Sequence, residues 1–309
     1  MALFKNILVT GGSGFIGSSL RKIKPNWKYL SSKECDLTDK NAFYEYLCDV
    51  KPDAIIHLAA RVGGIKDSIN NQGEFLYLNN LININVIHQA YRANVKRVLS
   101  ALSTCCFQDK SNSYPLNEEN ILSGTPTDSN LAYGYAKRML FLQSKYYSEN
   151  YKLTYNTFTP SNIYGPHNSF DLENSHFISS MIRKFYEAKE GEKITFWGTG
   201  KPLRQSLYVD DLAEIIVLLL EKHLTNLPII VAPNENISIK DHIKFLQRRV
   251  NKNNDIFFDN SIDGQFRKDG SNKELISLIG DYNFTPLEEG LYKTYDWYSK
   301  ECKKLKLNN

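Results

Sequence analysis

Residues 5–17 read K-N-I-L-V-T-G-G-S-G-F-I-G, a short apolar run that ends in a glycine-rich turn. The apolar run predicts a buried strand over residues 5–10, because it is continuous and turn-forming residues close it. A helical apolar pattern begins near Phe15, directly after the turn. A strand, a tight turn and a helix in this order form the first half of a βαβ unit, so the stretch predicts an α/β fold built on a parallel sheet.

The turn carries glycines whose spacing bears on its chemistry. Gly11, Gly14 and Gly17 satisfy G-x-x-G-x-x-G, and Gly12 in place of the first gives G-x-G-x-x-G. Glycine here permits a tight turn, lets the backbone approach a pyrophosphate, and brings the helix close to the strand, with its first N–H groups facing the negative charge. A glycine turn without a ligand is the alternative, which the preceding strand disfavours. The predicted cofactor-binding residues of the loop are Gly11, Gly12, Ser13, Gly14, Phe15, Ile16 and Gly17.

The alternation of strands and helices continues to about residue 166. Strands are predicted over 28–30, 54–60, 97–103 and 153–159, and helices over 42–50, 75–93 and 133–150. This alternation indicates a doubly wound parallel sheet of the Rossmann type. Beyond it, helices are predicted over 177–189 and 209–223 and strands over 194–197 and 228–232. We expect a dinucleotide-binding Rossmann domain over residues 1–165 and a smaller C-terminal α/β substrate-binding lobe over 166–309, with interleaved segments.

The composition is that of an ordinary globular protein. Of the 309 residues, 42% are hydrophobic and 23% are charged, and the net charge of +4 is too small to indicate nucleic-acid binding. The five cysteines include no C-x-x-C pair, which argues against a disulfide framework or a zinc site. No apolar run approaches the ~18 residues that span a bilayer, and no leader pattern precedes the first strand. We expect a cytoplasmic protein that binds no metal, membrane or nucleic acid, with the basic stretch 300–306 as a solvated helix end.

The stretch after the second predicted strand bears on the choice of cofactor. An acidic residue there usually holds the ribose 2′-OH of NAD, whereas this chain has Ser32 and Lys33. Serine and lysine can accept the 2′-phosphate of NADP, which an aspartate would repel. NADP(H) is therefore favoured, with Asp36 and Leu37 expected near the adenine. Glu34 lies about 20 residues after the loop and keeps NAD open.

Tyr133-Gly-Tyr-Ala-Lys137 begins a predicted helix, and a spacing of four puts the first and last side chains on one face. Reduction of a ketone needs a hydride at carbon and a proton at oxygen. A tyrosine can supply the proton if a nearby cation lowers its pKa, and Lys137 is predicted to be that cation. Ser103 and Thr104, at the end of a predicted strand, are expected to hydrogen-bond the carbonyl. Two exposed polar residues on a helix are the alternative for the pair.

Several further segments extend these matches. They are H-L-A-A-R-V-G-G-I (57–65), S-T-C (103–105), P-S-N-I-Y-G-P-H (160–167), N-S-H (174–176) and W-G-T-G-K-P-L-R (197–204). Together with the glycine loop and Y-G-Y-A-K, they resemble the extended short-chain dehydrogenase/reductases, and within them the GDP-L-fucose synthase family. V-G-G-I after H-L-A-A and N-S-H after Y-G-P-H are much more specific than the glycine loop.

The resemblance implies NADPH-dependent reduction of the C4 ketone of a GDP-4-keto sugar, with a second activity in the same site. A 4-ketone acidifies the protons on the adjacent carbons, so C3 and C5 can be inverted by a base on one face and an acid on the other. The family uses a cysteine after the Ser-Thr pair and a histidine in N-S-H, here Cys105 and His176. Core packing of Cys105 and helix capping by His176 are the alternatives. A homodimer is expected from the family.

The resemblance also implies ligand contacts at matching positions. Cofactor contacts beyond the glycine loop and residues 32–37 are Leu58, Ala59, Ala60, Ala101, Leu102, Lys137, Pro160, Asn162, Ile163 and His176. Substrate contacts are Thr104, Asn162, Lys184, Trp197, Arg204 and Asp269. A lysine and an arginine suit a nucleoside diphosphate, and Trp197 offers an apolar wall. A solvated face for the two cations and core packing for Trp197 are the alternatives.

The chain departs from the family after S-T-C, where Ile-Tyr-Pro is usual and Cys106-Phe107-Gln108 stands here, followed by a polar loop. That loop is expected to border the sugar, so a 6-deoxyhexose and a heptose both stay open. Other functions stay open as well: a reductase without epimerisation, a nucleotide-sugar 4-epimerase with tightly bound NAD, and a non-catalytic NADP(H) sensor. The sensor is disfavoured because the chain keeps Tyr133 and Lys137 together with Cys105 and His176.

Overall fold

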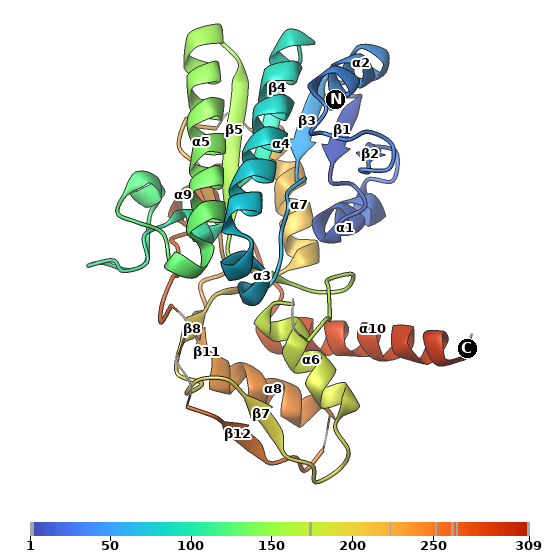
Figure 1. Ribbon diagram of the computed structural model, residues 1–309, viewed down its shortest axis with the longest axis vertical. Coiled ribbons are helices and arrows are strands. Elements are labelled where there is room, and N and C mark those ends of the chain that lie inside the picture. Colours follow the sequence, from blue (N-terminus) through green and yellow to red (C-terminus); the bar gives the residue numbers. More distant parts are fainter. Residues whose placement is uncertain are drawn as a thin grey trace.

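The computed structural model describes residues 3–172, 175–222, 224–250, 252–260, 263 and 265–307. Its centre is a six-stranded sheet in the order β10-β5-β4-β3-β1-β2, in which every neighbouring pair is parallel (Figure 1). The strands are β1 (Ile7–Thr10), β2 (Lys28–Leu30), β3 (Ala54–His57), β4 (Arg97–Ala101), β5 (Thr154–Pro160) and β10 (Ile229–Val231). The predicted doubly wound parallel sheet is confirmed. The strand order reverses between β1 and β3, which is where such sheets bind ligands.

Helices cover both faces of the sheet, because strand residues alternate between two apolar cores. Leu8 and Ile55 belong to a core that α2, α4 and α5 complete on one face. Val9 and Ile56 belong to a second core, which α1 and α7 complete on the other face. These helices are α1 (Phe15–Ile23), α2 (Lys40–Val50), α4 (Gln72–Arg92), α5 (Leu131–Tyr151) and α7 (Val209–Leu220).

Two strands end earlier than the sequence predicts. β3 ends at residue 57 rather than 60, and β4 ends at residue 101 rather than 103. Apolar residues continue beyond both ends because the first residue after each strand still makes one backbone hydrogen bond to a neighbouring strand. Leu58 N donates to Thr10 O at 3.2 Å, and Leu102 N donates to Phe158 O at 2.7 Å. The residues that follow therefore leave the sheet at its carboxyl edge, where a ligand can reach them.

A second, smaller lobe lies below the sheet in Figure 1 and has its own apolar core. Its elements are α6 (Phe177–Glu187), β7 (Ile194–Phe196), β8 (Leu203–Arg204), β11 (Ile237–Ser238), α8 (Ile239–Val250), β12 (Ile256–Phe258) and α10 (Leu287–Leu307). The parallel pair of β6 (Asn162–Tyr164) and β9 (Ser206–Tyr208) accompanies them, and α3 (Ile65–Asn70) and α9 (Lys273–Ile279) are short additions. The sequence did not predict α8, α9, α10 or β12. α8 and α10 are rich in polar residues, whereas α9 and β12 are short, of seven and three residues.

Segments from beyond residue 165 contribute to the first lobe, since α7 packs on the sheet and β10 pairs with β5. The division at residue 165 stays a prediction. The basic stretch 300–306 lies in the last turns of α10, as expected. The helix predicted over 209–223 ends at Leu220, and His223 lies outside the described residues. Within the described part of the chain, no helix combines the length and apolar character that a membrane crossing requires.

Candidate active site

The glycine loop follows β1 at the carboxyl edge of the sheet. Gly11 adopts φ +69°, and a Cβ there would lie 2.8 Å from the backbone N of Ala59. A Cβ at Gly17 would lie 2.7 Å from the carbonyl oxygens of Gly11 and Gly12. Both positions therefore exclude a side chain. Gly14 is the N-cap residue of α1, so the first N–H groups of the helix are presented beside glycines that let a pyrophosphate approach the backbone.

The segment after β2 explains how an acidic residue can coexist with a 2′-phosphate. The carboxylate of Glu34 accepts hydrogen bonds from Ser31 N at 2.9 Å and Ser31 Oγ at 2.7 Å. These bonds lower the pKa of Glu34 and turn its carboxylate back onto the loop. Ser32 and Lys33 are both exposed next to it.

Asp36 and Leu37 are placed differently from each other. Asp36 is exposed, and its Oδ1 accepts hydrogen bonds from Thr38 N and Oγ1 at 2.9 and 2.8 Å. Leu37 is buried in the core, and its carbonyl accepts a hydrogen bond from Asn85 Nδ2 at 2.8 Å. The proximity of these two residues to the adenine stays a prediction.

Tyr133 and Lys137 lie one turn apart on α5, beside the end of β4. Lys137 is buried, and its Nζ donates a hydrogen bond to the carbonyl O of Ala101 at 2.8 Å. The same Nζ lies 5.7 Å from the centre of the Tyr133 ring, and burial lowers the pKa of Lys137 to about 8. Gly134 permits this approach, because a Cβ there would lie 2.5 Å from the carbonyl O of Cys105. The pair therefore sits directly against the turn that carries Ser103, Thr104 and Cys105.

The pKa of Tyr133 moves opposite to the direction that the sequence argument required. Burial raises it above its ordinary value, and the neighbouring Cys105 and Cys106 add to the effect. The expected lowering by Lys137 is wrong for the chain alone, because the phenolate loses more by leaving water than an ammonium 5.7 Å from the ring restores. Tyr133 is consequently a neutral phenol at physiological pH, and this is the form that can donate a proton.

A buried polar network next to Lys137 was missed by the sequence analysis. His57 is 1% exposed, with Nδ1 2.8 Å from Thr10 Oγ1 and Nε2 3.1 Å from Asn83 Oδ1. The amide oxygen of Asn83 can only accept, so Nε2 carries the proton and Nδ1 accepts from the hydroxyl. Asn83 Nδ2 donates in turn to Ala136 O at 3.4 Å. Burial, aided by the charge of Lys137, lowers the pKa of His57 to about 3, so the ring is a neutral link between β3 and α5.

Cys105 lies in a 3-10 turn, η1 (Thr104–Cys106), and is half-buried. Its backbone N donates to Ser103 Oγ at 3.2 Å. Arg138 attaches the turn to α5, because its Nε donates to Cys106 O at 2.6 Å and its Nη1 donates to Gly124 O at 2.8 Å. The alternative for Cys105 was core packing. It is the neighbouring Cys106 that is fully buried in the core, and burial raises the pKa of its thiol to about 12.

His176 occupies the N-cap position of α6, as one alternative held, but its side chain makes no capping hydrogen bond. Its carbonyl accepts a hydrogen bond from Ser180 N at 3.1 Å. Partial desolvation and the positive charge of Lys268 lower the pKa of the ring, although the residue remains exposed to solvent. Asn174, in the same N-S-H segment, lies outside the described residues.

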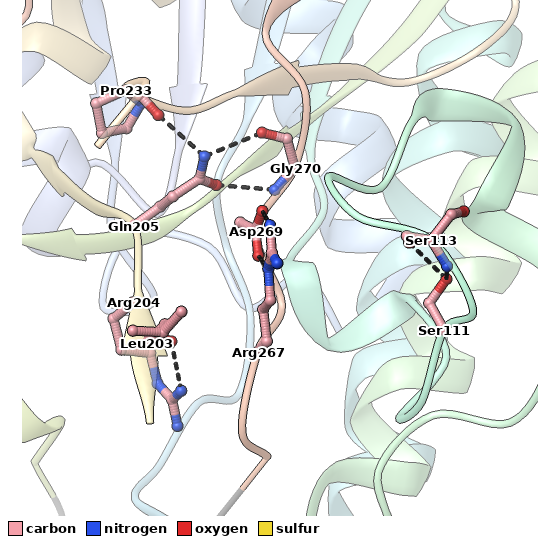
Figure 2. A network of polar contacts seen from close by, with 9 residues as sticks. All are labelled: Ser111, Ser113, Leu203, Arg204, Gln205, Pro233, Arg267, Asp269 and Gly270. Atoms are coloured by element: carbon pink, nitrogen blue, oxygen red, sulfur yellow. Dashed lines mark hydrogen bonds and ion pairs between the residues drawn. The ribbon is translucent and has the colours of Figure 1, made fainter. Parts of the chain in front are cut away.

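Arg204 and Lys268 bring two positive charges to one side of the site. Burial lowers the pKa of both side chains, the charge of Arg204 lowers that of Lys268 further, and Cys105 acts on both in the opposite direction. The sequence analysis missed Lys268 and predicted its neighbour Asp269. Asp269 is 4% exposed, and its carboxylate is held by Arg267 with Nε–Oδ1 2.5 Å and Nη2–Oδ2 2.9 Å (Figure 2). Substrate contact by Asp269 stays a prediction. In the structure its carboxylate is already bound by Arg267.

The other predicted substrate contacts have fewer partners within the site. Lys184 is half-buried, and its Nζ donates to Thr195 O at 2.7 Å. Trp197 is 62% exposed, with Lys66 Nζ 5.7 Å from its ring centre, so simple core packing is wrong for it. The predicted positions that follow the ends of β3, β4 and β5 all lie at the carboxyl edge of the sheet: Leu58, Ala59, Ala60, Leu102, Ser103, Thr104, Asn162 and Ile163.

A parallel sheet with a glycine loop after β1 and a Tyr-x-x-x-Lys pair beside the end of β4 defines a class of protein, the Rossmann-type dinucleotide-dependent oxidoreductases of the short-chain dehydrogenase/reductase kind. Residues 7–231 match the model of the NAD dependent epimerase/dehydratase family. The chain is also 38% identical over 305 residues to GDP-L-fucose synthase of Dictyostelium discoideum, with 95% of each chain covered. It is 37% identical to the probable GDP-L-fucose synthase of Drosophila melanogaster, with 95% of this chain and 97% of that one covered.

A solved structure agrees with these matches. The crystal structure of a GDP-L-fucose synthetase from Naegleria fowleri bound to NADP has a TM-score of 0.91 to this chain at 32% identity, and covers 98% of this chain and 95% of that one. The chain belongs to the GDP-L-fucose synthase family, within the NAD dependent epimerase/dehydratase family.

Proposed function

We propose that this chain uses NADPH to reduce the C4 ketone of a GDP-4-keto sugar and inverts C3 and C5 in the same site. The observation that carries the proposal is the packing of α5 on the turn after β4. It brings Tyr133, the candidate acid, and Lys137, the candidate cation, against Cys105, the candidate base. The relatives named GDP-L-fucose synthase support the same activity for this chain.

The reduction assigns separate tasks to the pair on α5. When bound, NADPH supplies the hydride to C4. Tyr133 donates its proton to the C4 oxygen, and its raised pKa keeps it protonated until that moment. Lys137, with a pKa of about 8, is mainly charged at pH 7 and stabilises the phenolate that results. The bond from Lys137 to Ala101 O holds the ammonium beside the ring during the transfer.

The inversion assigns Cys105 as the base that removes a proton from C3 or C5 and His176 as the acid on the opposite face. A lowered pKa makes the protonated form of His176 a stronger acid. Arg204 and Lys268 suit the diphosphate of the substrate, because two cations held near each other repel until an anion comes between them. The same charges favour the enolate that forms during inversion.

NADPH is proposed over NADH because of the segment after β2. The carboxylate of Glu34 is bound to Ser31 and is not directed to a ribose hydroxyl. Ser32 and Lys33 stay available at the surface, and the lysine charge complements a 2′-phosphate. The glycine loop fits the pyrophosphate, since the cradle that it forms has no room for a Cβ at Gly11 or Gly17.

The test uses GDP-4-keto-6-deoxymannose and a GDP-4-keto-heptose, each incubated with the protein and NADPH in D2O. Net NADPH oxidation with deuterium at C3 or C5 of the product supports the full proposal. Oxidation without deuterium identifies a reductase alone. Altered sugar without net NADPH oxidation identifies a 4-epimerase that recycles its cofactor, and turnover of neither sugar refutes the proposal. The relative rates with the two sugars decide between hexose and heptose.

We also propose that the chain forms a homodimer through α4 and α5. Large apolar side chains recur at seven-residue spacing on α4, and the adjacent α5 adds others to the same exposed surface. They are Tyr77, Ile84 and Tyr91 on α4 and Tyr135, Met139 and Tyr146 on α5, which are 36% to 66% exposed. Light scattering should give twice the chain mass for the wild type and the single mass for Ile84→Glu with Met139→Glu. Leu305→Glu, on α10, is the control, and an unchanged mass in the double variant excludes this face.

A reducing, cytoplasmic location is proposed from the cysteines. All five are free thiols in the fold, and Cys35 and Cys106 are buried. Thiols in a protein of this kind stay reduced in the cytosol, where Cys105 would keep the reactive form that a base requires. Microscopy of the tagged chain in its own cells is the direct test.

A further inference from the structure

Gln205 connects three segments of the site from its position between β8 and β9 (Figure 2). Its Nε2 donates hydrogen bonds to Pro233 O and to Gly270 O, each at 3.0 Å. Its Oε1 accepts a bond from Gly270 N at 2.8 Å. The amide therefore pairs with both backbone groups of Gly270, as a neighbouring strand would, and both of its own N–H groups are used. Gln205 is 5% exposed, so water cannot easily replace these bonds.

The backbone of Gln205 also contacts Asn162, which is a predicted cofactor and substrate contact. Its carbonyl O accepts bonds from Asn162 N at 3.1 Å and from Asn162 Nδ2 at 3.2 Å. One residue thus links the segment after β5 to the segment that contains Gly270. The side chain serves only the latter, so a substitution of the side chain tests that link by itself.

Gly270 belongs to a segment that we call the strap, residues 265–271. On its other side the strap is bonded to the polar loop that follows η1. Leu116 N donates to Asp269 O at 2.8 Å, and Ser271 N donates to Leu116 O at 2.7 Å. Gln265 Nε2 donates to Asp109 O at 2.8 Å. The strap is consequently held from the first lobe by the polar loop. From β8–β9 it is held by the side chain of Gln205 and by Leu203, whose N donates to Phe266 O at 2.9 Å.

Lys268 stands in this strap, two residues before the Gln205 bonds. Lys268 is half-buried. Its charge lowers the pKa of His176, and Arg204 and Cys105 in turn shift the pKa of Lys268, so it belongs to the group of titratable side chains of the site. Arg204 and Lys268 carry like charges and repel each other, so the attachments of the strap oppose their separation. The bonds between Gln205 and Gly270 are the side-chain attachment on the Arg204 side, beside the backbone bond from Leu203 N to Phe266 O.

We propose that Gln205 is a positioning residue, which holds the strap so that Lys268 and Arg204 together bind the diphosphate of the substrate. The proposal rests on the proposed function for the identity of the ligand. Gln205 itself touches no substrate in this arrangement and acts through Lys268. Methionine has nearly the same length and volume but none of the three bonds. Glutamate could still accept from Gly270 N, but it would place a charge against two carbonyl oxygens.

The test measures binding of GDP and of NADPH by calorimetry, and KM and kcat with the GDP-4-keto sugar. Gln205→Met should weaken GDP and raise the sugar KM by about tenfold, the scale of coupling between contacting residues. NADPH affinity should stay within about twofold, because the glycine loop is elsewhere in the fold. Gln247→Met is the matched control. Gln247 lies on α8, and its Nε2 donates a hydrogen bond to Asn254 O at 2.8 Å. GDP binding by this variant should be unchanged.

A double-mutant cycle separates positioning from a general loss of structure. In a Lys268→Met background, Gln205→Met should change GDP affinity by less than about twofold, because the residue through which it acts is gone. Additive effects in the cycle, or wild-type GDP affinity in Gln205→Met, overturn the inference. Gln205→Glu should weaken GDP more than Gln205→Met does, and the reverse order also overturns it. If Gln205→Met does not fold, Gln205→Asn, which keeps the amide but shortens it, carries the same cycle. A wild-type protein that binds no GDP refutes the proposed function instead.

Discussion

Lys137→Met should make the protein more stable and inactive at the same time. Burial lowers the pKa of Lys137 from 10.5 to about 8, which corresponds to ~3 kcal/mol against folding while the side chain is charged. Loss of the bond from this charged donor to Ala101 O costs about 2 kcal/mol. The variant should therefore gain about 1 kcal/mol in the free energy of unfolding at pH 7. Ketone reduction should be lost, since the phenolate of Tyr133 would have no cation beside it.

The stability difference between the wild type and Lys137→Met should change with pH in a definite direction. Between the folded pKa of about 8 and the unfolded value of 10.5, the unfolded chain binds more protons than the native chain, so the stability of the wild type rises with pH. Below about pH 8 both states are protonated and the penalty is fully present. The advantage of Lys137→Met should be largest at pH 7 and disappear near pH 10.5. Urea unfolding at several pH values measures it, with Lys145→Met on the same helix as control. A variant that is less stable than the wild type at pH 7 refutes the reasoning.

Three further outcomes are expected. Tyr133→Phe should lower ketone reduction by at least about 100-fold, while NADPH binding followed by fluorescence stays within about twofold, because only the proton donor is lost; retained reduction would show another acid. Cys105→Ser should depress deuterium exchange at C3 and C5, measured by mass spectrometry, far more than reduction of an already inverted ketone, and unchanged exchange would mean another base. Gly11→Ala should weaken NADPH binding by about tenfold or more, because its φ is +69° and its Cβ would meet the Ala59 backbone. Gly73→Ala, whose Cβ would meet nothing within 4 Å, should bind normally, and equal losses in both variants would contradict the account of the loop.

The two lobes differ in how well the sequence predicts them. In the first, predicted strand runs of three to seven residues alternate with amphipathic stretches, and the strands β1 to β5 lie where those runs lie. In the second, α8 and α10 have few apolar residues for their length, because each helix buries only a narrow stripe on a small core. The apolar stripe of α8 keeps a helical period, but the many polar residues around it make the helix hydrophilic on average, and the sequence analysis did not recognise it. The early ends of β3 and β4 were missed for another reason, since apolar composition continues where the chain has already left the sheet.

What the sequence determined by itself is local: the strand–loop–helix that opens the chain, the spacing of Tyr133 and Lys137, and the family. The first two depend on residues close together in the sequence, and the family depends on several such short motifs between the glycine loop and residue 204, so local spacing encodes them. Only the tertiary structure decided that Lys268 stands with Cys105 and Arg204, that Arg267 occupies Asp269, and that the pKa of Tyr133 rises. Most of those outcomes depend on hydration and charge contributed by separate segments, up to 163 residues apart for Lys268 and Cys105, and no local pattern records which distant side chain will remove water from a given group.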